Sequence, residues 1–224
     1  MKLDIYIPVG GYGKRLGAIT KIIPKPLIKI DNEQFIIKLI RSFNKLEITN
    51  FYLLTSYKEK QFFFLKKRLS SLKINFVKDK RKEGTFKSLY NCRKSLTNNF
   101  IYSNSDEILD LSLKNIVKTF KSEKIDILQL FFKDILGKKL DKKLVINKKK
   151  FNDKKNYTEA GLKIFKKNIF KNIRNKNYKS IEDFIESNLA QLNVKFLIIE
   201  TRPYSIDTWK RLRRTKLFLK KTKF

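Results

Sequence analysis

Histidine is absent from this 224-residue sequence, and cysteine occurs only once, at Cys92. Zinc sites and Ser-His hydrolytic sites are built on imidazole or thiolate groups, so both kinds of site are disfavoured. A lone cysteine also excludes an internal disulfide framework and fits a reducing compartment. We therefore expect a cytoplasmic protein.

Long uncharged apolar runs are missing too. No stretch approaches the roughly 18 apolar residues of a membrane-spanning helix. Asp4 interrupts the opening residues MKLDIYIPVGG, which are therefore not expected to act as a signal peptide. Hydrophobic residues still make up 42% of the chain and aromatic residues 13%. This composition predicts one globular domain over residues 1–224, with no membrane span.

Acidic residues are scarce: 21 Asp and Glu stand against 53 Lys and Arg, which gives a net charge of +32. Proteins that read nucleic-acid sequence favour arginine forks, whereas here lysine dominates and is spread over the whole chain. The excess of Lys, Asn, Ile and Phe is typical of A/T-rich codons. We expect no specific nucleic-acid partner, although the charge will attract nucleotides and phosphorylated metabolites.

Strand-like and helix-like stretches alternate along the chain, which predicts a doubly wound, mostly parallel, Rossmann-like α/β sheet. The expected strands are residues 2–9, 50–56, 72–78, 98–106, 124–132, 157–165 and 194–201, with a hairpin arm at 142–153. The expected helices are residues 31–46, 58–69, 85–96, 111–122, 181–192 and 208–221. Asp31 or Asn32 is the expected cap of helix 31–46, and Ser180 with Asp183 forms a capping box for helix 181–192.

The last expected helix is strongly basic. Its Trp209, Leu212 and Leu219 are expected to cover the sheet, with the cations in water. The alternative is a helix that lies on an acidic membrane surface.

A glycine-rich loop follows the first expected strand, at the edge where ligands bind in such folds. Gly10, Gly11 and Gly13 lack a Cβ, so this turn can adopt positive φ and expose backbone N–H groups to a phosphate. Lys14 and Arg15 lie in the same loop, and Lys25 follows between two prolines that stiffen its backbone. An ordinary tight turn explains the glycines alone equally well, but the added cations favour phosphate binding.

The stretch GGYGKRLGAITKIIPKPL (10–27) resembles the signature G-G-x-G-[ST]-R-L…P-K-P-[LM] of the sugar-1-phosphate nucleotidylyltransferases, especially the bacterial heptose-1-phosphate and mannose-1-phosphate guanylyltransferase group. Weaker likenesses to that group follow in the expected order: SYK (56–58), EGT (83–85), NSD (104–106), AGLKIF (160–165), SIEDFIESN (180–188) and SID (205–207).

The resemblance implies transfer of a nucleoside monophosphate from an NTP to a sugar-1-phosphate, with release of pyrophosphate. By this likeness the catalytic residues are Arg15, Lys25 and Asp106, and Asp106 with Asp207 holds Mg²⁺. The residues that it assigns to substrate binding are Gly10, Gly11, Gly13, Lys14, Glu83, Gly84, Thr85, Asn104 and Gly161. Residues 1–135 would form the nucleotide-binding half, and residues 136–224 the half that binds the sugar and closes the site.

This chemistry agrees with the composition. A phosphate monoester has a second pKa of about 6, so at neutral pH it is a dianionic nucleophile that needs no general base. What the reaction requires is alignment and neutralisation of phosphate charge, which Mg²⁺, Arg and Lys supply.

Simpler roles are open for several of these residues. Asp106 and Asp207 are also suited to capping a turn or helix, Lys25 to a place on the surface, and Glu83 and Thr85 to the start of a helix.

Three departures from the signature leave the identity of the nucleotide and of the sugar open. Lys14 replaces Ser or Thr, Phe86-Lys87 replaces two small residues, and the stretch DTWKR (207–211) lacks the usual Gly and Pro. Two further hypotheses are a cytidylyltransferase acting on phosphocholine-like phosphates and a non-catalytic nucleotide or polyanion binder.

Overall fold

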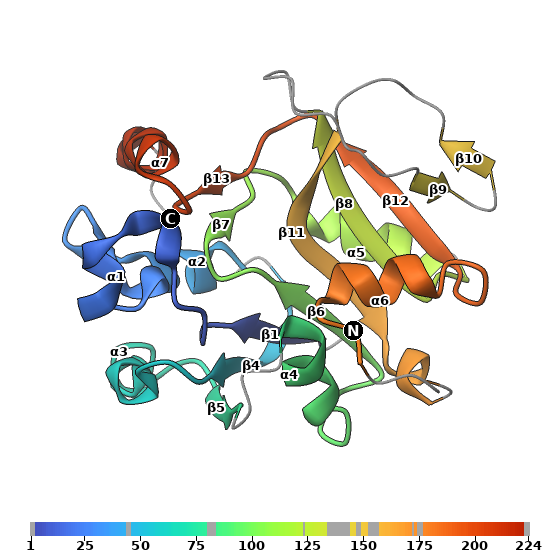
Figure 1. The fold of residues 1–224 in the computed structure, drawn as a ribbon, viewed down its shortest axis with the longest axis horizontal. Helices are drawn as coiled ribbons and strands as arrows, with labels where there is room; N and C mark the ends of the chain where they lie inside the picture. Colours follow the sequence, from blue (N-terminus) through green and yellow to red (C-terminus); the bar gives the residue numbers. More distant parts are fainter. Residues whose placement is uncertain are drawn as a thin grey trace. The chain divides into compact units, whose positions relative to one another are not determined.

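The computed structural model describes residues 3–43, 46–79, 84–122, 124–133, 144–146, 149–151, 157–171, 173 and 177–221. The chain divides into two compact units, each built from separate segments. The first unit comprises residues 1–82, 103–110 and 203–224, and the second comprises residues 83–102 and 111–202. Figure 1 labels most of their helices and strands. Residue 135, the expected boundary between the two halves, and Glu83 lie outside the described residues.

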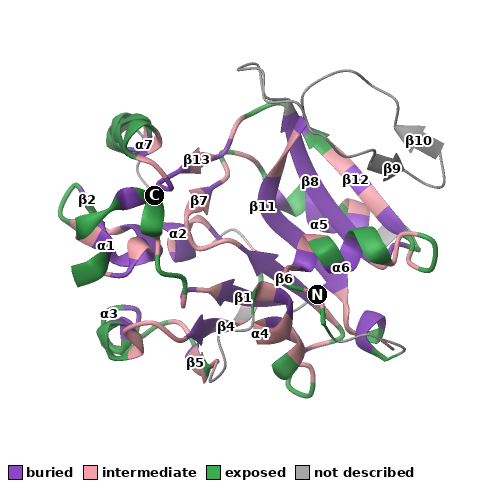
Figure 2. Cartoon of the chain, viewed as in Figure 1, coloured by how far each residue is buried: buried purple, intermediate pink, exposed green. Residues whose placement is uncertain are grey.

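Three parallel strands form the core of the first unit, in the order β1 (Leu3–Pro8), β4 (Ile48–Thr55) and β5 (Ile74–Lys78). Strand β1 is buried along almost its whole length (Figure 2), as the near-continuous apolar run of a parallel strand requires. Its buried Asp4 accepts a hydrogen bond of 2.9 Å from the Asn50 side chain. These strands confirm the expected strands at 2–9, 50–56 and 72–78.

Short elements complete the first unit. Its helices are α1 (Ala18–Ile22), α2 (Phe35–Ser42), α3 (Leu65–Arg68) and α7 (Trp209–Lys221), with 3-10 turns η1 (Lys14–Leu16), η2 (Lys25–Leu27) and η3 (Glu59–Phe62). Two small antiparallel pairs join them: β2 (Lys29–Ile30) with β3 (Glu33–Gln34), and β7 (Glu107–Ile108) with β13 (Tyr204–Ser205).

The helix expected at 31–46 begins later than predicted, at Phe35. Asp31 and Asn32 do not cap it, because they form the two-residue turn between β2 and β3, with φ angles of 51° and 66°. Asp and Asn tolerate this left-handed conformation better than most residues, so the pair suits a tight hairpin. The helix expected at 58–69 is likewise interrupted, since η3 and α3 replace it.

The strands of the second unit lie in the order β12 (Val194–Ile199), β8 (Ile127–Lys133), β11 (Tyr157–Lys166) and β6 (Asn99–Ser103). Strand β12 is parallel to β8, whereas β11 is antiparallel to it. Antiparallel β9 (Leu144–Ile146) and β10 (Lys149–Phe151) confirm the hairpin expected near 142–153. Among the pairings of the long strands described here, parallel pairs therefore predominate, as the alternating pattern predicted.

The helices of the second unit are α4 (Thr85–Asn91), α5 (Leu113–Ser122) and α6 (Ile181–Ser187), with the 3-10 turn η4 (Lys167–Phe170). The predicted cap of α6 is confirmed, because Ser180 Oγ accepts a 3.1 Å hydrogen bond from the Asp183 N–H. Phe86 is fully buried against the rings of Tyr178 and Phe184, both at 5.0 Å. It is therefore a core residue of the second unit.

Helix α7 packs against β13, and its buried residues Leu212, Thr215 and Leu219 lie on one side of the helix. Leu212 and Leu219 are buried, as expected, but Trp209 is 50% exposed, so the expectation that it is covered together with them is wrong. Among the described residues, no helix combines the length and hydropathy needed to cross a membrane.

Candidate functional site

The glycine loop after β1 depends on two of its glycines for different reasons. Gly13 has a φ of 63°, and a Cβ there would lie 2.9 Å from Thr20 Cγ2 and 3.1 Å from Lys25 Cβ. Gly10 does not have a positive φ, but a Cβ at this position would lie only 2.7 Å from Ser56 Cβ. Gly11 needs neither explanation, since its Cβ position is open. The turn thus adopts the expected positive φ, and it does so at Gly13 and not at Gly10 or Gly11.

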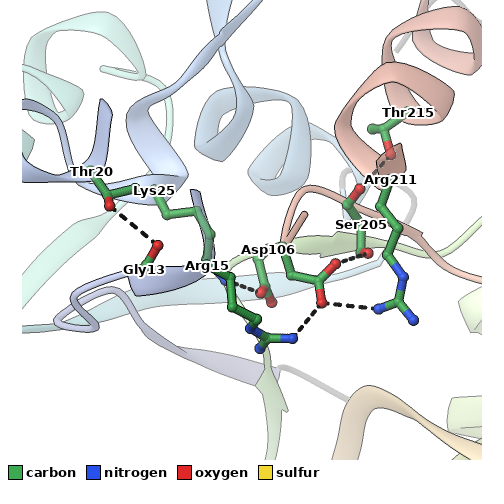
Figure 3. Close-up of polar contacts among 9 residues, drawn as sticks. Gly13, Arg15, Thr20, Lys25, Asp106, Ser205, Arg211 and Thr215 are labelled. Carbon is green, nitrogen blue, oxygen red and sulfur yellow. Dashed lines mark hydrogen bonds and ion pairs between the residues drawn. The ribbon is translucent and has the colours of Figure 1, made fainter. Parts of the chain in front are cut away.

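Lys25 lies at the start of η2 and forms an ion pair with Asp106, which precedes β7. Both side chains are largely buried, with 15% and 16% of their surface exposed. Pro24 and Pro26 flank the lysine, and their fixed φ angles limit the freedom of its backbone. Figure 3 shows the Lys25 side chain directed at the Asp106 carboxylate. Lys25 is therefore not an isolated surface lysine.

Asp207 follows β13 and carries a second set of polar contacts. Its Oδ2 accepts hydrogen bonds from Arg15 Nη1 at 2.7 Å and from Arg211 Nη1 at 3.0 Å. Its Oδ1 accepts one from Ser205 Oγ at 2.9 Å. Burial alone would raise the pKa of Asp207, but the Ser205 hydrogen bond and the two guanidinium groups outweigh it and hold this pKa below its ordinary value. The carboxylate is therefore ionised at neutral pH.

The β7–β13 pair brings the segments of Asp106 and Asp207 side by side, although about 100 residues separate them in sequence. The Ile206 N–H donates to the Asp106 carbonyl oxygen at 3.0 Å, immediately beside both aspartates. Asp207 is not the cap of α7, because Thr208 Oγ1 accepts from the Arg211 N–H at 3.3 Å and fills that role. The alternative of a simple helix cap at Asp207 is therefore wrong.

Arg211 is a member of this cluster that was not anticipated from the sequence. The signal was present, because residues i and i+4 lie on the same face of a helix and Asp207 stands four residues before Arg211. Helix α7 also supports Ser205, whose carbonyl oxygen accepts a 2.7 Å hydrogen bond from buried Thr215 Oγ1 (Figure 3).

The donor set is compatible with Mg²⁺. Within the described part of the chain, no group of three or more His, Cys, Asp or Glu side chains is arranged to hold a metal ion. Mg²⁺ does not require one, because it is commonly held by one or two carboxylates together with substrate phosphates and water. Asp106 and Asp207 supply two carboxylates on adjacent segments, so these residues fit the ion.

Lys14 and Asn104, two of the predicted substrate-binding residues, also belong to the first unit. Lys14 opens η1 and is exposed. Asn104 follows β6 and is partly exposed, and its carbonyl oxygen accepts a 3.2 Å hydrogen bond from Ser103 Oγ. Both lie on the segments that carry Arg15 and Asp106.

Gly84 and Thr85 belong to the second unit, where they join the start of α4 to the start of α6. Gly84 has a φ of 98°, and a Cβ there would overlap the Lys179 carbonyl oxygen. Thr85 Oγ1 accepts a 3.3 Å hydrogen bond from the Ile181 N–H. The structure therefore gives this pair a packing role.

Gly161 lies in β11 of the second unit, at an irregularity in the pairing with β8 between Ala160 and Lys163. The Lys163 side chain is fully buried, and its Nζ donates to Glu159 and, at 2.7 Å, to Glu182 Oε1. Burial disfavours the charge of Lys163, but the two carboxylates outweigh it and raise the pKa of the lysine. Burial raises the pKa of Glu159 despite Lys163, whereas for Glu182 the lysine outweighs burial and lowers the pKa.

Comparison with known proteins agrees with these features. The Nucleotidyl transferase family matches residues 7–137, which contain the glycine loop, Lys25 and Asp106. A D-glycero-alpha-D-manno-heptose 1-phosphate guanylyltransferase from Campylobacter jejuni is 27% identical over 211 residues, which cover 92% of this chain and 94% of that protein. Mannose-1-phosphate guanyltransferase beta-B from Xenopus laevis is 34% identical over 122 residues, 51% of this chain. This match spans only 34% of the length of the Xenopus protein.

Solved structures agree on the fold. A Bacillus anthracis protein assigned as a glucose-1-phosphate thymidylyltransferase and crystallised with sucrose superposes with a TM-score of 0.85 at 18% identity, covering 100% of this chain and 97% of that one. HddC from Yersinia pseudotuberculosis, complexed with GMP-PN, gives a TM-score of 0.75 at 19% identity, covering 96% and 99% of the two chains. The match over more than half of the sequence, together with this fold, identifies the chain as a member of the Nucleotidyl transferase family.

Proposed function

We propose that this protein transfers a nucleoside monophosphate from an NTP to a sugar-1-phosphate, giving an NDP-sugar and pyrophosphate with Mg²⁺ as cofactor. The observation that carries the proposal is the cluster of Arg15, Lys25, Asp106 and Asp207 beside the glycine loop. Phosphoryl transfer requires positioned cations and carboxylates that can hold Mg²⁺, and two of each are present on adjacent segments. A histidine is not required.

Each residue has a distinct role in this proposal. Lys25 and Arg15 bind the phosphates and offset their charge, and the backbone N–H groups of the loop at 10–13 add further donors. Asp106 and Asp207 hold Mg²⁺, which supplies charge neutralisation at the phosphate oxygens when bound. The sugar phosphate attacks as a dianion, so alignment and not deprotonation is the task of the protein.

The substrates are proposed from the relatives. Because both named relatives are guanylyltransferases, GTP with a heptose- or mannose-1-phosphate is the first pair to test. In this proposal residues 1–135 bind the nucleotide and residues 136–224 bind the sugar, with Gly161 in the sugar site. Glu83, Gly84 and Thr85 would complete the nucleotide site. Gly84 and Thr85 would then contact the substrate as well as pack α4 against the start of α6.

The test is pyrophosphate release with a panel of NTPs and sugar-1-phosphates, phosphocholine included. Asp106→Asn and Lys25→Met are expected to lower turnover by about 100-fold or more, because each removes a charge that faces the reacting phosphates. Lys29→Met is the matched control: Lys29 is exposed, and its side chain makes no hydrogen bond or ion pair with the described residues. Normal turnover in Asp106→Asn would refute the assignment of this carboxylate.

The panel also separates the alternatives. Release only with CTP and phosphocholine would identify the cytidylyltransferase reaction. Tight binding of Mg·NTP with no release for any pair would indicate a non-catalytic binder.

A further inference from the structure

Tyr57 and Lys58 follow β4 and belong to the S-Y-K stretch, to which the proposed chemistry gives no role. The Tyr57 hydroxyl lies 3.2 Å from the Thr20 carbonyl oxygen and 3.1 Å from that of Lys21. Lys58 Nζ donates to the carbonyl oxygens of Lys21 at 2.5 Å and of Ile22 at 2.8 Å. Two consecutive side chains thus bind three consecutive carbonyl groups.

These carbonyl groups form the C-terminal end of α1. The last carbonyls of a helix have no partner within the helix, and a cation near them is favourable because it opposes the negative end of the helix dipole. Lys58 reaches them from a left-handed backbone conformation, with a φ of 51°, which is uncommon for a residue with a side chain. A cationic cap on a helix of only five residues replaces interactions that the helix cannot make itself.

Helix α1 connects the glycine loop to Lys25. Thr20 Oγ1 lies within hydrogen-bond distance of the carbonyl oxygens of Gly13, at 3.2 Å, and Gly17, at 3.0 Å, so the helix is tied back to the loop. Only Ile23 and Pro24 separate the end of α1 from Lys25. A displaced α1 would therefore move both the loop and the lysine.

The Tyr57 ring reaches the loop as well. It contacts the ring of Tyr12, the central residue of the glycine loop, with a centroid distance of 4.9 Å. One side chain thus binds the loop through its ring and the far end of α1 through its hydroxyl.

We propose that Tyr57 and Lys58 are positioning residues that hold residues 10–25 as one unit, so that Lys25 stays opposite Asp106. The inference rests on the proposed function insofar as this segment binds phosphate. The two residues touch no reacting atom in this proposal, and they act through the backbone of α1.

Hydrogen–deuterium exchange tests whether Tyr57 and Lys58 hold residues 10–25 in place, independently of any activity. In Lys58→Met, amides of residues 13–28 are expected to exchange faster, while those of β1 and β5 are unchanged. Lys60→Met is the control, because Lys60 is exposed on the adjacent turn and its side chain makes no hydrogen bond or ion pair with the described residues. Equal exchange in Lys58→Met and Lys60→Met would overturn the proposal.

Binding of inorganic triphosphate with Mg²⁺, measured by calorimetry, tests the link to the site. Lys58→Met is expected to weaken binding by about tenfold, which corresponds to the free-energy contribution of one or two charge-assisted hydrogen bonds. Tyr57→Phe, which keeps the ring, is expected to have a smaller effect, and Lys58→Arg should restore most of the affinity. Faster exchange with unchanged affinity would overturn the positioning role. Pyrophosphate release by the wild-type protein judges the proposed function separately.

Discussion

Replacement of the buried lysine in the second unit gives the sharpest test of the energetics. Lys163→Met keeps a side chain of similar length but removes the only cation between Glu159 and Glu182 that the described residues supply. The lysine side chain is 0% exposed, while those of the two glutamates are 22% and 36% exposed. The substitution therefore leaves two partly buried carboxylates facing each other.

Breaking a buried ion pair by removing one partner costs about 3–5 kcal/mol, because the other charge stays behind without compensation. Both glutamates reach some solvent, so we expect the lower end, about 3 kcal/mol in the free energy of unfolding. For a chain of 224 residues this corresponds to a melting temperature lower by roughly 6–12 °C.

The loss should shrink as the pH falls. In the wild-type protein the lowered pKa of Glu182 contributes stability that is present above its ordinary value of 4.5 and is lost as the pH falls below it. Glu159 has a raised pKa, so its contribution has the opposite sign. Without Lys163 we expect the pKa of both glutamates to rise, because burial and the neighbouring carboxylate then act without an opposing cation, so that lowering the pH removes part of the uncompensated charge. The deficit of Lys163→Met is therefore larger at pH 8 than at pH 5.

Chemical denaturation at both pH values measures this difference. Lys78→Met is the matched control, because the Lys78–Glu59 pair has an N–O distance of 2.8 Å but its lysine is 61% exposed. Such surface pairs contribute about 0–1 kcal/mol. Adding Glu182→Gln to Lys163→Met should recover part of the loss. A loss in Lys163→Met no greater than in Lys78→Met, or one equal at pH 5 and pH 8, would refute this reasoning.

Three other substitutions have defined outcomes. Gly84→Ala should lower the free energy of unfolding by at least about 2 kcal/mol in chemical denaturation, from a strained positive φ and the clash with Lys179, whereas Gly11→Ala, at an open position, should not. Ser180→Ala removes the cap of α6 and should cost about 1 kcal/mol in the same assay, and a neutral result would contradict the capping geometry. Arg211→Gln should raise the pKa of Asp207 in a carboxyl NMR titration, while Arg213→Gln, which replaces an exposed residue, should leave it unchanged.

The local sequence correctly predicted elements whose signals lie in neighbouring residues, such as an apolar run that is buried or a cap beside its helix. The apolar run at 3–8 became a buried strand, and Ser180 with Asp183 capped a helix, because both signals depend on near neighbours in the chain. The helix start at Asp31 was wrong because the same residue types also favour left-handed turns, and the pairing of β2 with β3 decided between the two. Tertiary packing likewise decided the exposure of Trp209, because α7 buries Leu212, Thr215 and Leu219 where it packs on β13 and leaves Trp209 half exposed.

For the site, the sequence by itself determined the residue types: a glycine loop with two nearby cations, and two aspartates that follow strand-like segments. It also determined that no histidine takes part, since the chain has none. Only the tertiary structure decided which charges meet, because the pairing of Lys25 with Asp106 and of Arg15 with Asp207 spans 81 and 192 residues of sequence. Contacts at such separations depend on strand pairing and helix packing and not on local propensity, and for the same reason the contacts of Tyr57 and Lys58 with the end of α1 became visible only in the folded chain.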